Sequence, residues 1–378
     1  MTGKLAEPRI DPAQAMELWK DDPAFQGLND SLSLVLKEIN EGLWKALNRL
    51  AGSPELLGMI RYQLGFASSD FTPLQPDVPV RRGQRLRSTM AILIARSFNA
   101  SEEVVRALAI AAEYAHAASL VHDDIQDCDS LRWGRPTTWK AFGIDHAINV
   151  GDALIAMTFL ELCQLRGLGV PAPLALDAIA AYSKTFFVMT NGQSMDLSGP
   201  AESRCSYTEY LRMISFKTAS AFSTGCYVSA LIGNATPDVA DSYASFGEAF
   251  GLVYQICDDI NSIRQSQERT GKHPLKDIEL RKLTLPVIIA LQQEGTLLRR
   301  YVGLETVWDK SCQAELLSKV GSEEVLHQCR ARALEWGQKA VQALSGNIHH
   351  GSQCNRTLRL ITERLCASLG IASAELQI

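Results

Sequence analysis

Apolar residues recur at intervals of three and four along most of this 378-residue chain. Such spacing places them on one face of an α-helix. The first clear case starts at Ser31 and is stopped by Gly52-Ser53-Pro54, and a second helix follows from Pro54 to Phe66. Alternation of period two with β-branched residues, which is typical of strands, is absent. The pattern predicts an all-α protein.

From Ser88 onward nearly every segment is periodic or continuously apolar. We expect helices over 88–98, 102–126, 145–166, 172–196, 207–232, 238–266, 283–295, 311–319, 322–345 and 354–369. Three segments, 102–126, 145–166 and 238–260, are apolar on almost every side, as are helices in the middle of a large bundle. Because no repeat and no long linker interrupts the chain, we predict one domain over 1–378, a single large helix bundle.

Two segments depart from the helical pattern. Residues 1–30 are polar and punctuated by proline, and we expect an N-terminal arm there with one short helix from Pro12 to Lys20. Residues 67–82 contain three prolines and no periodicity. This composition predicts a surface loop.

Composition and charge narrow the class of protein. Hydrophobic residues make up 46% of the chain and charged residues 21%, which is typical of a soluble globular protein. The net charge of −5, with dispersed Lys and Arg, argues against a nucleic-acid or anionic-membrane surface. The nine cysteines form no CxxC pair and lie mostly in apolar segments, as in reduced proteins. We therefore expect a cytoplasmic protein with no export signal and no membrane span.

The candidate chemistry begins at His122-Asp123-Asp124-Ile125-Gln126-Asp127. In a helix Asp123 and Asp127 share a face, with Asp124 alongside. Three carboxylates in one small volume repel each other unless a hard cation neutralises them, and Mg²⁺ accepts carboxylates together with water and substrate phosphate. We interpret this segment as a site for metal and diphosphate, and the alternative is a solvated acidic helix end.

A second acidic cluster, Asp258 and Asp259 followed by Ser262, closes another mostly apolar helix. If both helices lie in one bundle, the two clusters can face each other across a central cavity and hold metal ions around one diphosphate. Lys217 interrupts an apolar segment, where an unpaired charge would be costly. We therefore expect an anionic partner for Lys217.

Together these motifs resemble, in order, those of the trans-isoprenyl diphosphate synthase (polyprenyl synthetase) family. The matching segments are HAASLVHDDIQDCDSLRWGRPT, VGDAL at 150–154 (the family's GD turn), GQSMDL at 192–197, FKTAS at 216–220, YQICDDI at 254–260 and GK(x)₄D(x)₄KLTLP at 271–286. The resemblance covers the chain from about Gly83 to Pro286. It implies an all-α bundle with a central cavity, an allylic prenyl diphosphate substrate and three Mg²⁺ ions, for which Mn²⁺ can substitute.

The resemblance also implies roles for single residues. The implied metal ligands are Asp123, Asp124, Asp127 and Asp258. The implied ligands of the diphosphate are Arg132, Lys217 and Lys272, with Gln193, Asp196 and Gln255 in support. Ser262 stands where an aspartate is usual, and with Asp258 it is similar to the first two ligands of the metal motif of class I terpene cyclases. The third position of that motif is Ser266, not glutamate.

Two further family features concern chain length and assembly. The floor of the family's pocket lies about five residues before the first aspartate, where short-chain enzymes often carry an aromatic residue. Here Ala118 and Ser119 stand there, which implies a deeper pocket for C15 to C20 or longer chains. Elongating members of the family are commonly homodimers joined through apolar helix faces, so we expect a homodimer.

The chain departs from the family where the second substrate, isopentenyl diphosphate, is held. The usual G-K-R-x-R-P reads Gly83-Gln84-Arg85-Leu86-Arg87-Ser88, and Trp133 replaces the second arginine of R-R-G. Of the four groups that hold this diphosphate in the family, Arg87 and His116 remain. Losing two charge-assisted hydrogen bonds would weaken binding by about 3–6 kcal/mol, a factor of about 10² to 10⁴.

These departures leave three interpretations. In the main one, the enzyme ionises a C15–C20 allylic diphosphate and converts it to a terpene, or transfers it to another acceptor, without isopentenyl diphosphate. In the second, a trans-polyprenyl diphosphate synthase, making geranylgeranyl or longer chains, replaces the missing cations by neighbours such as Arg81, Arg82 or Arg85. In the third, the chain is a non-catalytic synthase subunit, against which the costly charge cluster argues.

Overall fold

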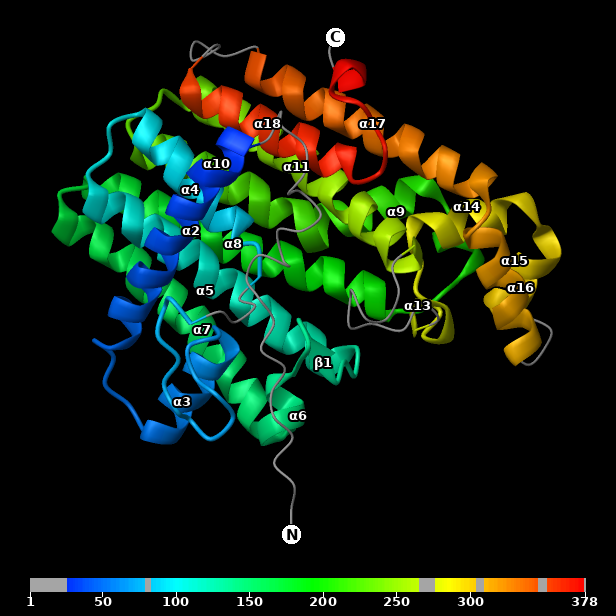
Figure 1. Ribbon diagram of the computed structural model, residues 1–378, viewed down its shortest axis with the longest axis horizontal. Helices are drawn as coiled ribbons and strands as arrows, with labels where there is room; N and C mark the ends of the chain where they lie inside the picture. The colour runs from blue at the N-terminus through cyan, green and yellow to red at the C-terminus, as the bar shows by residue number, and fades with distance from the viewer. Residues whose placement is uncertain (1–25, 79–82, 265–275, 304–308, 346–351, 377–378) are drawn as a thin grey trace. The chain divides into compact units, whose positions relative to one another are not determined.

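The computed structural model describes residues 26–78, 83–264, 276–303, 309–345 and 352–376. These residues are almost entirely helical, which confirms the all-α prediction (Figure 1). Contacts divide the chain into two compact units, 1–179 with 232–234, and 180–231 with 235–378. The single domain over 1–378 and its central cavity stay predictions. Most of the predicted arm, with its short helix, lies outside the described residues.

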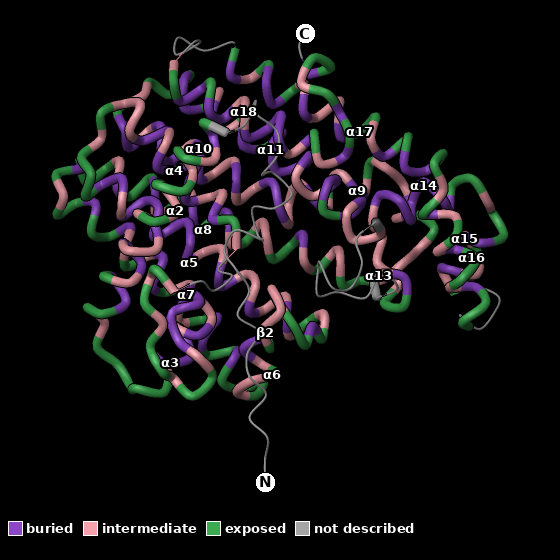
Figure 2. The backbone as a smooth tube through the Cα atoms, in the orientation of Figure 1, coloured by how far each residue is buried: buried purple, intermediate pink, exposed green. Residues whose placement is uncertain are grey.

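The first unit is built around helix α5. Its elements are α2 (Gln26–Leu47), α3 (Pro54–Gln63), α4 (Leu86–Ser97), α5 (Glu102–Gln126), β1 (Leu131–Arg132), β2 (Arg135–Pro136), α6 (Thr138–Phe142), α7 (Ile144–Gln164), the 3₁₀ helix η3 (Leu165–Leu168) and the start of α8 (Ala172–Leu197). Helix α5 contacts α2, α4 and α7, and it is buried along most of its length (Figure 2). The Ser101 side chain accepts a hydrogen bond from Val104 N and caps its start.

A short hairpin follows α5, although the sequence predicts no strands. Its two strands pair antiparallel, with Leu131 opposite Pro136 and Arg132 opposite Arg135. Trp133 and Gly134 form the turn with φ of 52° and 78°, the left-handed conformation that two-residue hairpin turns require. Strands of two residues are too short to show any periodicity, so the hairpin could not be found from the hydrophobic pattern.

The second unit is built around α11. Its elements are the remainder of α8, the 3₁₀ helix η4 (Glu202–Arg204), α9 (Tyr207–Ile214), the π-helix η5 (Ser215–Ala219), α10 (Ser220–Ile232), α11 (Pro237–Arg264), α13 (Lys276–Glu279), α14 (Leu285–Gln293), α15 (Gly295–Tyr301), α16 (Lys310–Val320), α17 (Glu323–Ser345), α18 (Gln353–Ala367) and the 3₁₀ helix η6 (Ser373–Leu376). Helix α11 packs against α17, η5, α14 and α18, and their apolar residues form one buried core. Residues 207–232, which we predicted to form one helix, form three elements in the structure: α9, the π-helix η5 and α10.

Two stretches among the described residues are long and apolar enough to cross a membrane. They are Glu102–Gln126 and Ile144–Leu168, whose apolar windows are 72% and 39% buried. Helices buried in a protein core can have the same length and composition, and most of α5 is buried. The expected absence of a membrane span therefore stays a prediction.

Candidate active site

The predicted metal ligands of the first unit lie at the C-terminal end of α5. Asp124 is buried, whereas Asp123 and Asp127 are half-buried. Asp127 is the C-cap of the helix, and its N–H donates to Asp123 O at 2.8 Å. Cys128 then takes a φ of 52°, which turns the chain into the hairpin. The three carboxylates are thus gathered in one helical turn, as predicted.

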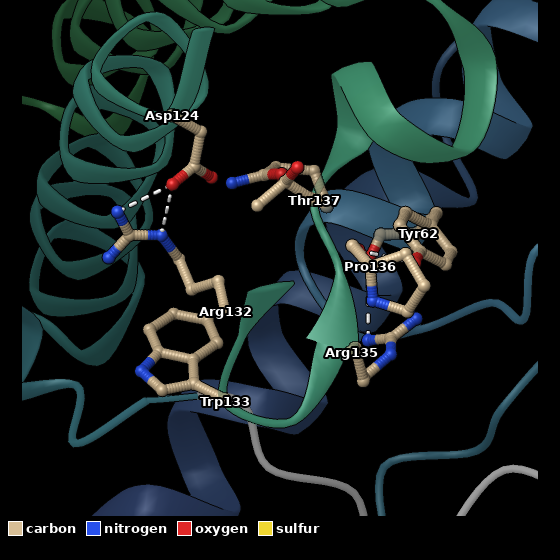
Figure 3. Close-up of a pocket in the computed structure, with 8 residues that line it drawn as sticks. Tyr62, Asp124, Arg132, Trp133, Arg135, Pro136 and Thr137 are labelled. Carbon is tan, nitrogen blue, oxygen red and sulfur yellow. Dashed lines mark hydrogen bonds and ion pairs between the residues drawn. The ribbon is translucent and has the colours of Figure 1, made fainter. Parts of the chain in front are cut away.

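Arg132 of β1 points back at this cluster. Its Nε donates to Asp124 Oδ1 at 2.8 Å, and its Nη2 lies 2.6 Å from the same oxygen and 3.5 Å from Asp123 Oδ2 (Figure 3). Burial raises the pKa of Asp124 to about 6, although Arg132 opposes the rise. Burial would lower the pKa of Arg132, but Asp124 and its neighbours outweigh it and raise that pKa. Arg132, a predicted diphosphate ligand, thus contacts two predicted metal ligands.

Helix α3 fixes the hairpin that carries Arg132. The Tyr62 hydroxyl donates to Pro136 O at 2.6 Å, and Thr138 Oγ1 donates to Gln63 Oε1 at 2.6 Å. The Arg135 guanidinium lies 4.3 Å from the centre of the Tyr62 ring and donates to Ala67 O at 2.9 Å. These contacts hold both residues of β2. Because Arg132 of β1 pairs with Arg135 of β2, its backbone is held by the same contacts.

Trp133 closes one side of a pocket beside Asp124 and Arg132. The pocket is lined by Tyr62, Gln63, Asp124, Arg132, Trp133, Arg135, Pro136 and Thr137 (Figure 3). The Trp133 ring lies against Gly83, where a Cβ would be 2.8 Å from a ring carbon. The departures Gln84 and Trp133 therefore occupy neighbouring positions, and the Gln84 side chain is exposed.

Arg87 and His116, the two groups predicted to remain of the second diphosphate site, lie together. Arg87 Nη1 and His116 Nε2 are 3.5 Å apart, on α4 and α5. Burial, assisted by Arg87, places the pKa of His116 well below its usual value, so its ring is neutral at neutral pH. Arg85 is not a replacement cation, since it is buried and bound to Glu113 and to Leu64 O. Arg81 and Arg82 lie outside the described residues.

The GD segment at 150–154 lies inside α7 and is not a turn. A Cβ on Gly151 would be 2.2 Å from His122 Nε2, so the glycine makes room for the histidine before Asp123. Asp152 Oδ1 lies 3.5 Å from the same nitrogen. The segment therefore supports the end of α5 by close packing.

In the second unit, Lys217 has an anionic partner within the protein. Asp196 of α8 accepts hydrogen bonds from Lys217 Nζ and from Lys282 Nζ, both at 2.7 Å. Burial would raise the pKa of Asp196, but the two ammonium groups outweigh it and lower that pKa. Two cations share one carboxylate, so the group is net positive and suited to a further anion. Lys272 lies outside the described residues.

The π-helix places Lys217 at this position. π-Helical turns are rare and occur frequently at functional sites. Gly192 of α8 packs against the π-helix backbone, where a Cβ would be 2.2 Å from Lys217 N. The amide nitrogen of Gln193 is buried and has no hydrogen-bond partner among the described residues. The GQ segment thus provides close packing at the Lys217 backbone, through Gly192, and a buried donor, Gln193.

The second acidic cluster divides into an inner and an outer carboxylate. Asp259 is buried and accepts from Tyr210 Oη at 2.8 Å, Gln255 Nε2 at 2.9 Å and Leu285 N at 3.0 Å. Burial raises the pKa of Asp259 to about 7 against these donors. Asp258 is exposed, and the Ser262 hydroxyl donates to Asp259 O at 2.8 Å. Asp258 is thus the solvent-exposed carboxylate of this cluster.

Carboxylate and hydroxyl oxygens are ligands that Mg²⁺ accepts, so Asp123, Asp124 and Asp127 in the first unit, and Asp258 and Ser262 in the second, fit such ions by their chemistry. Within the described residues, however, no group of three or more His, Cys, Asp or Glu side chains is placed to hold a metal ion. The facing of the two clusters and the three ions stay predictions. Ala118, the predicted pocket floor, is fully buried on α5.

Comparison with known proteins gives consistent matches. The family model described as Polyprenyl synthetase matches residues 77–317. The geranylgeranyl diphosphate synthase of Sulfolobus acidocaldarius is 34% identical over 56% of this chain. The match covers 63% of that enzyme's length, which is less than two thirds. The geranylfarnesyl diphosphate synthase of Aeropyrum pernix is 33% identical over 70% of this chain and 83% of that enzyme's length. A crystal structure of a polyprenyl synthetase from Streptomyces coelicolor A3(2) superposes with a TM-score of 0.74 at 26% identity, over 88% of this chain and 99% of that one.

We predict that Gly192→Ala destabilises the protein, because its new methyl group would meet the backbone of Lys217. Overpacking of this kind lowers the free energy of unfolding by about 1–3 kcal/mol. Gly225→Ala in α10 is the matched control, since no atom lies within 4 Å of its Cβ position. That change should stabilise the helix by up to about 1 kcal/mol. Equal urea midpoints for the two variants would contradict the close contact.

Proposed function

Because the chain belongs to the polyprenyl synthetase family, we propose that it is a Mg²⁺-dependent trans-prenyl diphosphate synthase that condenses an allylic diphosphate with isopentenyl diphosphate. This is the second of the three interpretations. The relatives' names, which are those of diphosphate synthases, support it over terpene formation. The observation that carries it is the pairing of Arg87 with His116, the retained half of the second diphosphate site.

The first half of the reaction is the loss of diphosphate from the allylic substrate. Lys217 and Lys282 on one carboxylate leave a net positive charge for the departing group. Arg132 adds a guanidinium that Asp124 holds in a fixed direction. Mg²⁺ ions held by Asp123, Asp124 and Asp127 of α5 and by Asp258 and Ser262 of α11 would supply further stabilisation of the leaving group's charge.

The second half is the attack by isopentenyl diphosphate. Arg87 offers a guanidinium, and the neutral His116 ring offers one nitrogen that donates and one that accepts. Gln84 can donate a hydrogen bond without charge, whereas Trp133 offers an apolar ring. We therefore expect a working but weak second site. The same two residues favour terpene formation as the second candidate function.

We predict that farnesyl or geranylgeranyl diphosphate with Mg²⁺ and labelled isopentenyl diphosphate yields a longer, labelled diphosphate. The double variant Gln84→Lys/Trp133→Arg should lower the KM for isopentenyl diphosphate, by at most about 10² to 10⁴, because two charged donors are restored. Gln328→Lys, an exposed site on α17, controls for added charge. If label is not incorporated and a diphosphate-free terpene forms, the condensing function is wrong and terpene formation stands.

We predict that Ala118→Phe shortens the preferred product, because the larger side chain would fill the pocket floor that we assign to Ala118. Chromatography of the dephosphorylated products measures chain length. Ala117→Phe, at the neighbouring buried position of α5, should destabilise the fold comparably without shortening the product. Turnover of C5 and C10 diphosphates alone by the unaltered protein would contradict the deeper pocket.

We predict a homodimer joined through the apolar face of α7, where Ile144 and Ile148 are 50% and 43% exposed one turn apart. Light scattering at micromolar concentration should give twice the mass of one chain. Ile148→Asp should weaken the dimer, because a charge cannot be buried there without a partner. Leu34→Asp on α2, at a position 71% exposed, should leave the mass unchanged. A stable monomer of the unaltered chain would refute this assembly.

We also propose that the protein works in the cytoplasm. All nine cysteines lie in the described residues, where they form no disulfide, and seven of them are buried. Such thiols persist in a reducing compartment.

A further inference from the structure

Glu113 of α5 is a buried carboxylate that binds Ser88 in the first turn of α4 and Arg85, the residue before that helix. Its Oε1 accepts from Arg85 Nη1 at 2.8 Å, and its Oε2 accepts from Ser88 Oγ at 2.5 Å. Both charged side chains are only 3% exposed. Arg85 Nη2 also donates to Leu64 O at 2.9 Å. Glu113 therefore joins the start of α4 to the middle of α5.

Arg85, which Glu113 binds, has an unusual backbone conformation. Arg85 is the residue before α4 and has a φ of 50°, with no side-chain cap for the helix. A residue other than glycine adopts this left-handed conformation only where its surroundings hold it. The Arg85 side chain supplies that hold through Glu113 and Leu64. The conformation in turn sets the direction in which α4 leaves the segment at Gly83.

The residues held in this way flank the second diphosphate site. In the sequence, Arg87 lies between Arg85 and Ser88, the two residues that donate hydrogen bonds to Glu113. His116 follows Glu113 by three positions, so both lie on the same face of α5. The Glu113 contacts thus fix the spacing of α4 and α5 where Arg87 meets His116.

We propose that Glu113, acting through Arg85 and Ser88, is the positioning residue of the second diphosphate site. It touches no substrate, and it sets the distance between Arg87 and His116. The inference rests on the proposed function, because it concerns the site for isopentenyl diphosphate. The alternative is a buried ion pair that serves stability alone.

The opposite end of the same helix pair offers a matched control. Arg96, in the last turn of α4, contacts Glu102 in the first turn of α5 through Nε at 2.9 Å, and Glu38 of α2 through Nη2 at 2.5 Å. This network joins the same two helices far along α4 from Arg87. Glu102→Gln therefore tests the stability of the α4–α5 contact without touching the diphosphate site.

The experiment compares Glu113→Gln, Ser88→Ala and Glu102→Gln in steady-state kinetics and thermal unfolding. Glu113→Gln should raise the KM for isopentenyl diphosphate about tenfold or more, because Arg85 loses its charged partner and Arg87 is no longer held. Ser88→Ala, which keeps the ion pair, should raise it about threefold. The KM for the allylic diphosphate should change less than about twofold in all three, and Glu102→Gln should leave both KM values unchanged.

The outcomes separate the two roles. A Glu113→Gln protein with lowered stability and an unchanged KM for isopentenyl diphosphate overturns the positioning role. If that variant does not fold, Ser88→Ala decides, and an unchanged KM there has the same meaning. If the unaltered protein does not turn over isopentenyl diphosphate, the proposed function fails. Calorimetric binding of isopentenyl diphosphate then tests the inference: weaker binding to Ser88→Ala supports it, and equal or absent binding overturns it.

Discussion

A buried carboxylate is costly unless cations or donors surround it, and this constraint shapes the polar interior of both units. Asp124 is held by Arg132, Glu113 by Arg85, and Asp196 by two lysines. Asp124 and Asp196 thereby fix cations that the proposed reaction uses, and Glu113 fixes Arg85 at the start of α4. Because Arg132 and the lysines are ordered before any substrate binds, little of the binding free energy is lost in ordering them.

The polar groups of the site stand where the helices become irregular. Arg132 lies on a hairpin of two-residue strands, Lys217 on a π-helix, and Arg87 two residues after the left-handed residue that precedes α4. Each irregularity is held by a close contact, such as Gly192 against the Lys217 backbone. Regular helices bury apolar faces, whereas these short segments direct charged side chains.

The proposed second diphosphate site shows how few residues would separate two outcomes of one chemistry. A carbocation can be captured by an alkene held beside it, or it can react within its own chain. Arg87 and His116 favour the first outcome, and Trp133 in place of a cation favours the second. The departures at Gln84 and Trp133 made terpene formation the main interpretation of the sequence. The family match and the named relatives favour condensation instead.

The sequence by itself determined the helices and the two acidic clusters, because helical periodicity and i, i+4 spacing are local properties. Segment 102–126 matches α5, and the end of this helix gathers Asp123 with the C-cap residue Asp127. The sequence did not indicate that Arg85 is bound to Glu113 or that Lys282 meets Asp196, 86 residues away. Only tertiary packing decided these pairs. A charged side chain needs a particular partner only where it is buried, and that burial exists only in the folded chain.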